Sequence, residues 1–134
     1  MKLGIVGVGT VGLATLETFI DHGHDVRSHD IKFNGATTLN TVVDCEIIFL
    51  CVPTPTVDHL CDTSAIEDVI QELSDLQYSG IVAIKSTVIP GTTTRLQQQY
   101  PNLTICCVPE FLRGDHAYEG FAEKYDMLIV GTDD

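Results

Sequence analysis

The sequence predicts an α/β fold: a doubly wound, mostly parallel Rossmann-like sheet in a single domain. Two observations carry this prediction. Apolar segments of strand length alternate with segments of helical periodicity along the whole chain, and a glycine-rich turn joins the first strand to the first helix. Such alternation is typical of parallel sheets with right-handed crossovers. A length of 134 residues suits one domain, and no repeat or low-complexity linker divides it.

The first half of the chain supplies three predicted strands and two predicted helices. Residues 2–8 form a short β-branched strand, residues 25–30 a second, and residues 46–52 a nearly continuous apolar run typical of a buried parallel strand. Apolar spacing predicts a helix over residues 10–21. A second helix is predicted from Ser64, which forms a capping box with Glu67 ahead of apolar positions at helical spacing.

The second half continues the same alternation. Strands are predicted at residues 81–85, 103–108 and 127–130. A short helix is expected between the first two of these, beginning near Gly91 or Thr92. Each strand therefore follows a helix or a turn, as a doubly wound sheet requires.

Charge and composition exclude several classes of function. Seven Lys and Arg against 19 Asp and Glu give a net charge of −12, which repels nucleic acids and anionic membrane surfaces. The longest apolar run, residues 47–52, is far shorter than the roughly 20 residues of a membrane span. Five cysteines without a C-x-x-C pair indicate reduced thiols, most of them small core residues, in a cytoplasmic protein without a metal site.

A glycine-rich loop carries the main functional signal. The loop reads Gly7-Val8-Gly9-Thr10-Val11-Gly12, directly after a predicted strand and at the start of a predicted helix. Gly7 permits a tight turn, Gly9 lets a pyrophosphate approach the backbone, and Gly12 lets the helix pack closely on the strand. Asp30 ends the next strand, where its carboxylate suits the adenosine ribose of NAD and repels the 2′-phosphate of NADP.

Lys32 lies close to Asp30 in the sequence, so it is a further candidate for cofactor binding. Its positive charge could weaken the discrimination against NADP. The alternative interpretation is a glycine turn that binds nothing, with Asp30 only solvating a strand end. The agreement of strand, helix and acidic residue in one register favours dinucleotide binding.

Polar residues also follow the later strands. Val52, Pro53 and Thr54 end one strand, Ser86 and Thr87 end the next, and Glu110 follows the strand after that. Ligands of open α/β sheets bind at this carboxyl edge, so these residues are expected along the cofactor and substrate rim. The plainer alternative is that they stop strands, cap turns and solvate the surface.

Three segments together resemble the UDP-glucose/GDP-mannose dehydrogenase family: residues 52–55 (VPTP), 85–93 (KSTVIPGTT) and 109–113 (PEFLR). The resemblance extends from Met1 to about Gly131 and implies the family's N-terminal NAD-binding domain. It places Thr54 and Thr87 against the cofactor, with Thr87 near the reacting centre. It also implies a sugar-nucleotide site lined by Glu110, Phe111 and Leu112, so Thr87 and Glu110 are the catalytic candidates.

The resemblance also implies what residues 1–134 lack. The family oxidises a sugar-nucleotide alcohol to a carboxylate with NAD, using a Cys and a Lys that follow a central helix, and neither has a counterpart here. The cysteine nearest the rim, Cys51, is interpreted as a strand residue. Gly114 also replaces the family's usual second Glu. We therefore expect an NAD-binding domain that is catalytically incomplete alone, without the central helix and sugar-nucleotide domain, and completed by a missing domain or partner subunit.

Two other functions remain open at this point. The first is a stand-alone NAD-binding regulator or partner protein without dehydrogenase activity, which the changed Glu position favours. The second is half of a 3-hydroxyacid dehydrogenase, which would share the glycine loop but not the VPTP and PEFLR segments.

Overall fold

The computed structural model describes residues 1–34, 38–110 and 129–132. Five parallel strands form one sheet in the order β2-β1-β3-β6-β7, which confirms the predicted doubly wound topology. The strands are β1 (Lys2–Val6), β2 (Asp25–His29), β3 (Ile47–Leu50), β6 (Ile81–Ile84) and β7 (Thr104–Cys107). The chain reverses its direction of winding between β1 and β3, and open α/β sheets bind ligands at such a point.

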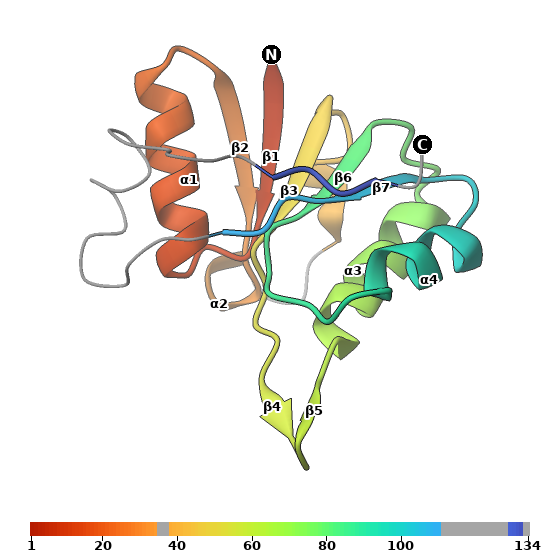
Figure 1. Ribbon diagram of the computed structural model, residues 1–134. Helices are drawn as coiled ribbons and strands as arrows, with labels where there is room; N and C mark the ends of the chain where they lie inside the picture. Colours follow the sequence, from red (N-terminus) through yellow and green to blue (C-terminus); the bar gives the residue numbers. More distant parts are fainter. Residues whose placement is uncertain (35–37, 111–128, 133–134) are drawn as a thin grey trace.

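Helices cover both faces of the sheet (Figure 1). On one face lies α1 (Thr10–Asp21), whose Phe19 ring lies 5.2 Å from the Phe49 ring of β3. The other face carries α3 (Ser64–Asp75) and α4 (Thr92–Gln99), and it holds the larger core. Residues of α3 that are fully buried in this core are Ile66, Ile70 and Leu73. No helix in the described ranges is both long and apolar enough to cross a membrane.

The turn after β1 is tied to both neighbouring strands. The Gly7 amide donates to the carbonyl of His29 over 2.9 Å, and the Cys51 amide donates to the carbonyl of Val6 over 2.8 Å. Gly7 has a φ of +90°, a conformation that side-chain-bearing residues rarely adopt. These contacts place the glycine-rich loop at the carboxyl ends of β2, β1 and β3.

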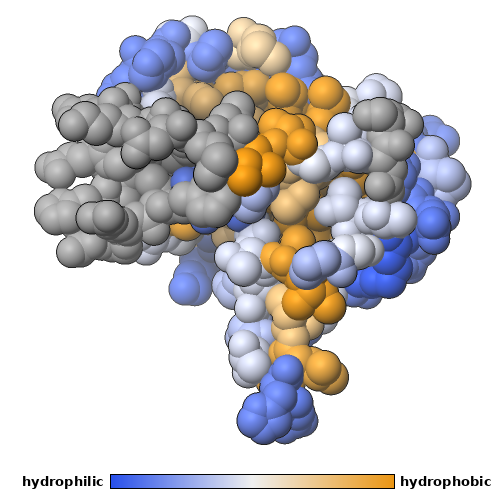
Figure 2. Space-filling view, viewed as in Figure 1, coloured by the Kyte–Doolittle hydropathy of each residue, from blue (hydrophilic) through white to orange (hydrophobic). Residues whose placement is uncertain are grey.

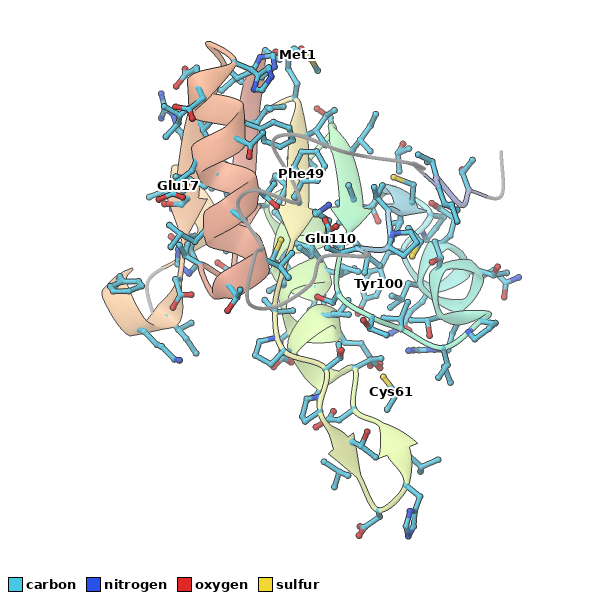
Figure 3. All side chains as sticks on the ribbon, turned by 60° about the vertical axis from the view of Figure 1, so that its left-hand side comes forward. Met1, Glu17, Phe49, Cys61, Tyr100 and Glu110 are labelled. Atoms are coloured by element: carbon cyan, nitrogen blue, oxygen red, sulfur yellow. The ribbon has the colours of Figure 1, made fainter. Side chains whose placement is uncertain are left out.

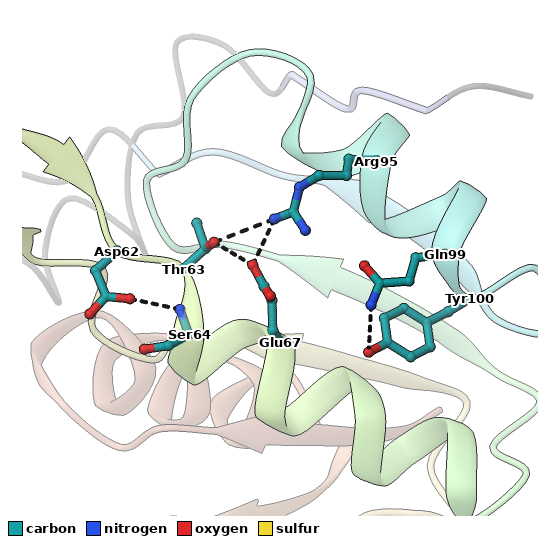
Figure 4. Close-up of polar contacts among 7 residues, drawn as sticks. All are labelled: Asp62, Thr63, Ser64, Glu67, Arg95, Gln99 and Tyr100. Atoms are coloured by element: carbon teal, nitrogen blue, oxygen red, sulfur yellow. Dashed lines mark hydrogen bonds and ion pairs between the residues drawn. The ribbon is translucent and has the colours of Figure 1, made fainter.

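The start of α3 differs from the predicted capping box. Thr63, not Ser64, is the N-cap, and the Thr63 hydroxyl donates to the Glu67 carboxylate over 2.7 Å (Figure 4). Arg95 of α4 donates to the same carboxylate over 2.7 Å. The hydrogen bonds from Thr63 and Arg95 lower the pKa of Glu67. The prediction was one residue off because Asp62 accepts the Ser64 amide at 2.9 Å and so turns the chain before the helix.

The predicted last strand is not formed in its described part. Residues 127 and 128 lie outside the described residues, and residues 129 and 130 are not in a strand. Gly131 instead makes an isolated antiparallel bridge with Cys107 of β7. Every ladder within the five-stranded sheet is parallel.

Several short elements went unpredicted. They are α2 (Ile31–Asn34), the 3₁₀ helix η1 (Leu39–Thr41), and a hairpin of β4 (Thr56–Val57) and β5 (Leu60–Cys61). The hairpin projects from the body of the molecule (Figure 1), and its tip is polar (Figure 2). Its tip residues Asp58 and His59 have φ values of 48° and 66°, as a tight two-residue turn between twisted strands requires.

All five cysteines are free thiols, as the sequence indicated. Only Cys45 is fully buried; Cys51, Cys61, Cys106 and Cys107 are partly exposed. The expectation that most of them are core residues was therefore wrong. Cys106 and Cys107 lie in β7, at the end of the sheet's strand order, where fewer neighbours cover their side chains.

Candidate cofactor-binding site

A cavity of about 530 Å³ opens at the carboxyl ends of β1, β2 and β3. That volume is in the range of small-molecule and cofactor pockets. Five segments line it: the glycine loop, the end of β2 and the residues after it, Leu39 of η1, the residues after β3, and one side of α3. The lining residues are Val6, Gly7, Val8, Gly9, His29, Asp30, Ile31, Lys32, Phe33, Leu39, Cys51, Val52, Pro53, Ala65, Asp68, Val69 and Glu72.

The three glycines of the loop face different constraints. A Cβ on Gly12 would lie 1.9 Å from the Gly7 carbonyl oxygen, and a Cβ on Gly7 would lie 2.7 Å from the carbonyl oxygen of Cys51. A Cβ on Gly9 would meet no heavy atom within 4 Å. Packing therefore explains glycine at positions 7 and 12 but leaves position 9 unexplained. The open space at Gly9 fits a group that must approach the backbone, as a pyrophosphate does.

Gly9 is also the N-cap of α1 and offers no side-chain acceptor to the helix. The first amides of a helix lack partners within the helix and attract anions. The start of α1, where Thr10 and Val11 follow Gly9, is therefore electrostatically suited to a diphosphate. In this respect the loop fits the dinucleotide predicted from the sequence.

Asp30 closes the loop on its other side. Its carboxylate accepts the Val8 amide over 2.6 Å and the Lys32 amide over 2.8 Å. Partial burial acts to raise the pKa of Asp30, but the hydrogen bonds from Val8 and Lys32 outweigh it, so the pKa lies below its ordinary value. The carboxylate is thus ionised at neutral pH and fixed in the lining of the cavity, where it can accept hydrogen bonds from hydroxyl groups.

Acidic side chains outnumber basic ones around the cavity. Asp68 and Glu72 of α3 join Asp30, whereas Lys32 is the one cation among the described lining residues. The Glu72 carboxylate accepts the Leu39 amide over 2.7 Å, which fixes η1 against α3. A ribose with free hydroxyls suits this lining better than a phosphorylated one.

Seven of the predicted cofactor residues meet at this cavity: Gly7, Val8, Gly9, Asp30, Lys32, Val52 and Pro53. Thr10, Val11 and Gly12 continue from the loop into α1 without lining the cavity. Sequence reasoning overlooked the contribution of α3, namely Ala65, Asp68, Val69 and Glu72. Their spacing of i, i+3, i+4 and i+7 places them on one face of the helix, and this spacing is the feature of the sequence that groups them.

The remaining predicted cofactor residues lie beside the cavity and contact the backbone. The Ser86 hydroxyl, largely buried, donates to the Val52 carbonyl over 2.7 Å. The Thr54 hydroxyl donates to the Thr87 carbonyl over 2.7 Å. Both bonds join the segment after β3 to the segment after β6, so Ser86 and Thr54 hold the rim in shape. The Thr87 side chain is exposed.

Glu110 lies inside the molecule near the strand ends (Figure 3). Its carboxylate is 2.5 Å from the Lys85 ammonium, and only 7% and 3% of the two side chains are exposed. Burial raises the pKa of the nearby Cys51 thiol to about 12, although the charge of Lys85 opposes this. Cys51 is therefore a neutral thiol at physiological pH. The other two predicted substrate residues, Phe111 and Leu112, lie outside the described residues.

Comparison with known proteins agrees with this geometry. The family model described as "UDP-glucose/GDP-mannose dehydrogenase family, NAD binding domain" matches residues 30–134. UDP-glucose 6-dehydrogenase AglM of Haloferax volcanii is 26% identical over 98% of this chain and 41% of its own length. The UDP-glucose 6-dehydrogenase of Rhizobium meliloti is 27% identical over 99% of this chain and 40% of its own length.

Solved structures show the same fold. A UDP-glucose dehydrogenase from Pyrobaculum islandicum superposes with a TM-score of 0.84 at 23% identity, over 99% of this chain and 41% of its own. A ternary complex of GDP-mannose dehydrogenase from Pseudomonas aeruginosa gives 0.82 at 21% identity, over 100% of this chain and 41% of its own. The chain spans about two fifths of the length of these relatives. From the matched family model, together with the fold and the cavity, we conclude that this chain belongs to the UDP-glucose/GDP-mannose dehydrogenase family and corresponds to its NAD-binding domain.

Proposed function

We propose that the cavity at the ends of β1, β2 and β3 holds NAD, with the diphosphate at Gly9 and the start of α1 and the adenosine ribose at Asp30. The observation that carries the proposal is the open space at Gly9, since packing alone requires no glycine there. The Asp30 carboxylate, already held by two backbone amides, is oriented to accept ribose hydroxyls. NAD supplies hydride transfer when bound.

The same lining supports a preference for NAD over NADP. A 2′-phosphate would lie against Asp30, within a cavity that Asp68 and Glu72 also make acidic. Lys32 opposes this repulsion, but its backbone amide contacts Asp30 and its single charge faces three carboxylates among the described lining residues. We expect NADP to bind more weakly than NAD.

We propose further that the chain is the cofactor domain of a nucleotide-sugar 6-dehydrogenase that oxidises a sugar-nucleotide alcohol to the carboxylate. Its similarity to UDP-glucose 6-dehydrogenases over nearly all of this chain supports the proposal. Thr87 remains the candidate nearest the reacting centre, because its side chain is exposed at the rim after β6. The residues that complete the reaction, including the nucleophilic Cys, would come from another domain or subunit.

Titration calorimetry with NAD and NADP tests the cofactor proposal. Wild type should bind NAD more tightly than NADP, and Gly9→Val should lose NAD binding while remaining folded, because its Cβ enters open space. Absence of NAD binding at millimolar concentration would refute the proposal. The chain alone should form no NADH from UDP-glucose or GDP-mannose; turnover would refute the claim that it is catalytically incomplete.

One observation favours a second candidate, an NAD-binding partner protein without dehydrogenase activity. Glu110 is committed to a buried ion pair with Lys85, and neither residue lines the cavity. A carboxylate held in this way is less available for acid–base work. Mixing the chain with candidate dehydrogenase subunits distinguishes the two: the first candidate gains NADH production, the second does not.

A further inference from the structure

His29 is a buried polar residue beside the cavity to which the sequence analysis assigned no role. It is the last residue of β2, and 3% of it is exposed. Its Nδ1 is buried and has no hydrogen-bond partner in the described part of the chain. A buried polar atom without a partner destabilises the fold, so an apolar residue of similar shape would serve the free protein better.

The strand register shows where the ring lies relative to the expected cofactor. His29 pairs with Val6, so its side chain is on the sheet face that Val6 shares with the core under η1 and α3. His29 precedes Asp30, and the same cavity is lined by Leu39 and Glu72, which are hydrogen-bonded to each other, and by Val69. With the diphosphate at Gly9 and the ribose at Asp30, this end of the cavity, formed by His29, Leu39, Val69 and Glu72, is left for the base.

Among the described residues, the lining at this end has few polar groups free to recognise a base. Leu39 and Val69 are apolar, and the Leu39 amide already donates to Glu72. A neutral imidazole offers one donor and one acceptor, and the edge of adenine presents both an amino group and ring-nitrogen acceptors. His29 thus adds a neutral donor and acceptor beside Glu72, whose carboxylate only accepts hydrogen bonds.

We propose that a ring nitrogen of His29 accepts a hydrogen bond from the adenine amino group of bound NAD, so that this site recognises the base as well as the ribose. The inference rests on the proposed cofactor site. Because Nδ1 is closed to solvent, the ring turns about its Cβ–Cγ bond to present a nitrogen to the base, and this torsion is soft in histidine. Binding then relieves the unpaired nitrogen of the free protein.

The proposal predicts opposite effects on stability and binding, which a purely structural histidine would not produce. His29→Phe keeps a planar aromatic ring, slightly larger than imidazole, and removes both nitrogens. The free variant should be at least as stable in urea as wild type, yet it should bind NAD about three- to tenfold more weakly, as the loss of one hydrogen bond implies. His24→Phe is the matched control, because His24 packs edge-on against Phe19 and does not line the cavity.

The test is a calorimetric comparison of NAD with nicotinamide hypoxanthine dinucleotide, which replaces the adenine amino group by a carbonyl. Wild type and His24→Phe should prefer NAD about three- to tenfold, and His29→Phe should bind both dinucleotides equally. An unchanged preference in His29→Phe, or none in wild type, would overturn the inference. If wild type binds neither dinucleotide, the cofactor proposal itself fails. If His29→Phe does not fold, the same comparison of the two dinucleotides with His29→Leu and with wild type still tests the inference.

Discussion

Lys85 and Glu110 form a buried ion pair at the carboxyl ends of β6 and β7, with 2.5 Å between the ammonium and the carboxylate. Breaking a buried ion pair by removing one partner typically costs about 3–5 kcal/mol, because the other charge stays buried while its partner is gone. Lys85→Met should therefore lower the free energy of unfolding by that amount. Lys85→Met with Glu110→Gln should recover most of the loss, because neither charge of the pair remains. Urea unfolding of both variants measures the difference.

Arg95 and Glu67 provide the matched control for this pair. They are 2.7 Å apart, a separation similar to that of the buried pair, but 48% and 37% of their side chains are exposed. An exposed pair contributes at most about 1 kcal/mol, so Arg95→Met should have a small effect that salt reduces further. If Lys85→Met proves no more costly than Arg95→Met, the buried pair does not hold the strand ends together.

The glycines of the cofactor loop should separate packing from ligand binding. Gly12→Ala forces a Cβ to 1.9 Å from the Gly7 carbonyl oxygen, a backbone atom that cannot move freely. We expect it to cost at least about 2 kcal/mol of stability. Gly9→Ala places its Cβ in open space, so its free energy of unfolding should change by less than about 0.5 kcal/mol while NAD affinity falls. Urea unfolding measures the stability of both variants, and titration calorimetry measures their NAD affinity. Equal losses of stability in the two variants would contradict the prediction.

Features set by local sequence were predictable. The glycine loop, α1 and Asp30 follow from spacing within one strand–turn–helix unit, and the structure brings Gly9 and Asp30 to one cavity. The hairpin was not predicted because its turn, Asp58-His59, lacks the glycine that normally marks such turns.

Features that depend on tertiary contacts were not predictable. The pairing of Lys85 with Glu110 arises because β6 and β7 are neighbours, so their ends meet. The α3 face and His29 join the cavity only because β2 lies beside β1 and η1 is held against Glu72. No local pattern distinguishes His29 from the other histidines, since its burial and its unpaired nitrogen exist only in the folded chain.

Asp30 should make stability depend on pH. Its pKa is lowered in the folded chain from an ordinary value of 3.8, because hydrogen bonds from Val8 and Lys32 outweigh partial burial. A carboxyl with a lowered folded pKa stabilises the fold above its unfolded pKa, and this contribution is lost as pH falls through the folded value. Wild type should therefore exceed Asp30→Asn in stability at pH 7, and the gap should shrink below about pH 4.

Urea midpoints from pH 7 to pH 3 measure this gap for Asp30→Asn. The control is Asp58→Asn at the exposed hairpin tip, where asparagine tolerates the positive φ. The control should follow wild type at every pH. If the stability difference between wild type and Asp30→Asn stayed constant with pH, the hydrogen bonds from the Val8 and Lys32 amides would not depend on the ionised carboxylate, and the prediction would be wrong.

Cys51 should be an unreactive thiol despite its place in the cavity lining. Burial raises its pKa to about 12, and the nearby Lys85 charge offsets this only in part because Glu110 neutralises it. At pH 8 only roughly one Cys51 in ten thousand is a thiolate, and the thiolate is the nucleophile. Both thiols are partly exposed, but the raised pKa of Cys51 should let iodoacetamide at pH 8 alkylate Cys61 of the hairpin well before Cys51, as peptide mass mapping would show. Rapid alkylation of Cys51, slowed by NAD, would instead mean that the folded chain activates this thiol and that it remains a candidate for chemistry at the cofactor rim.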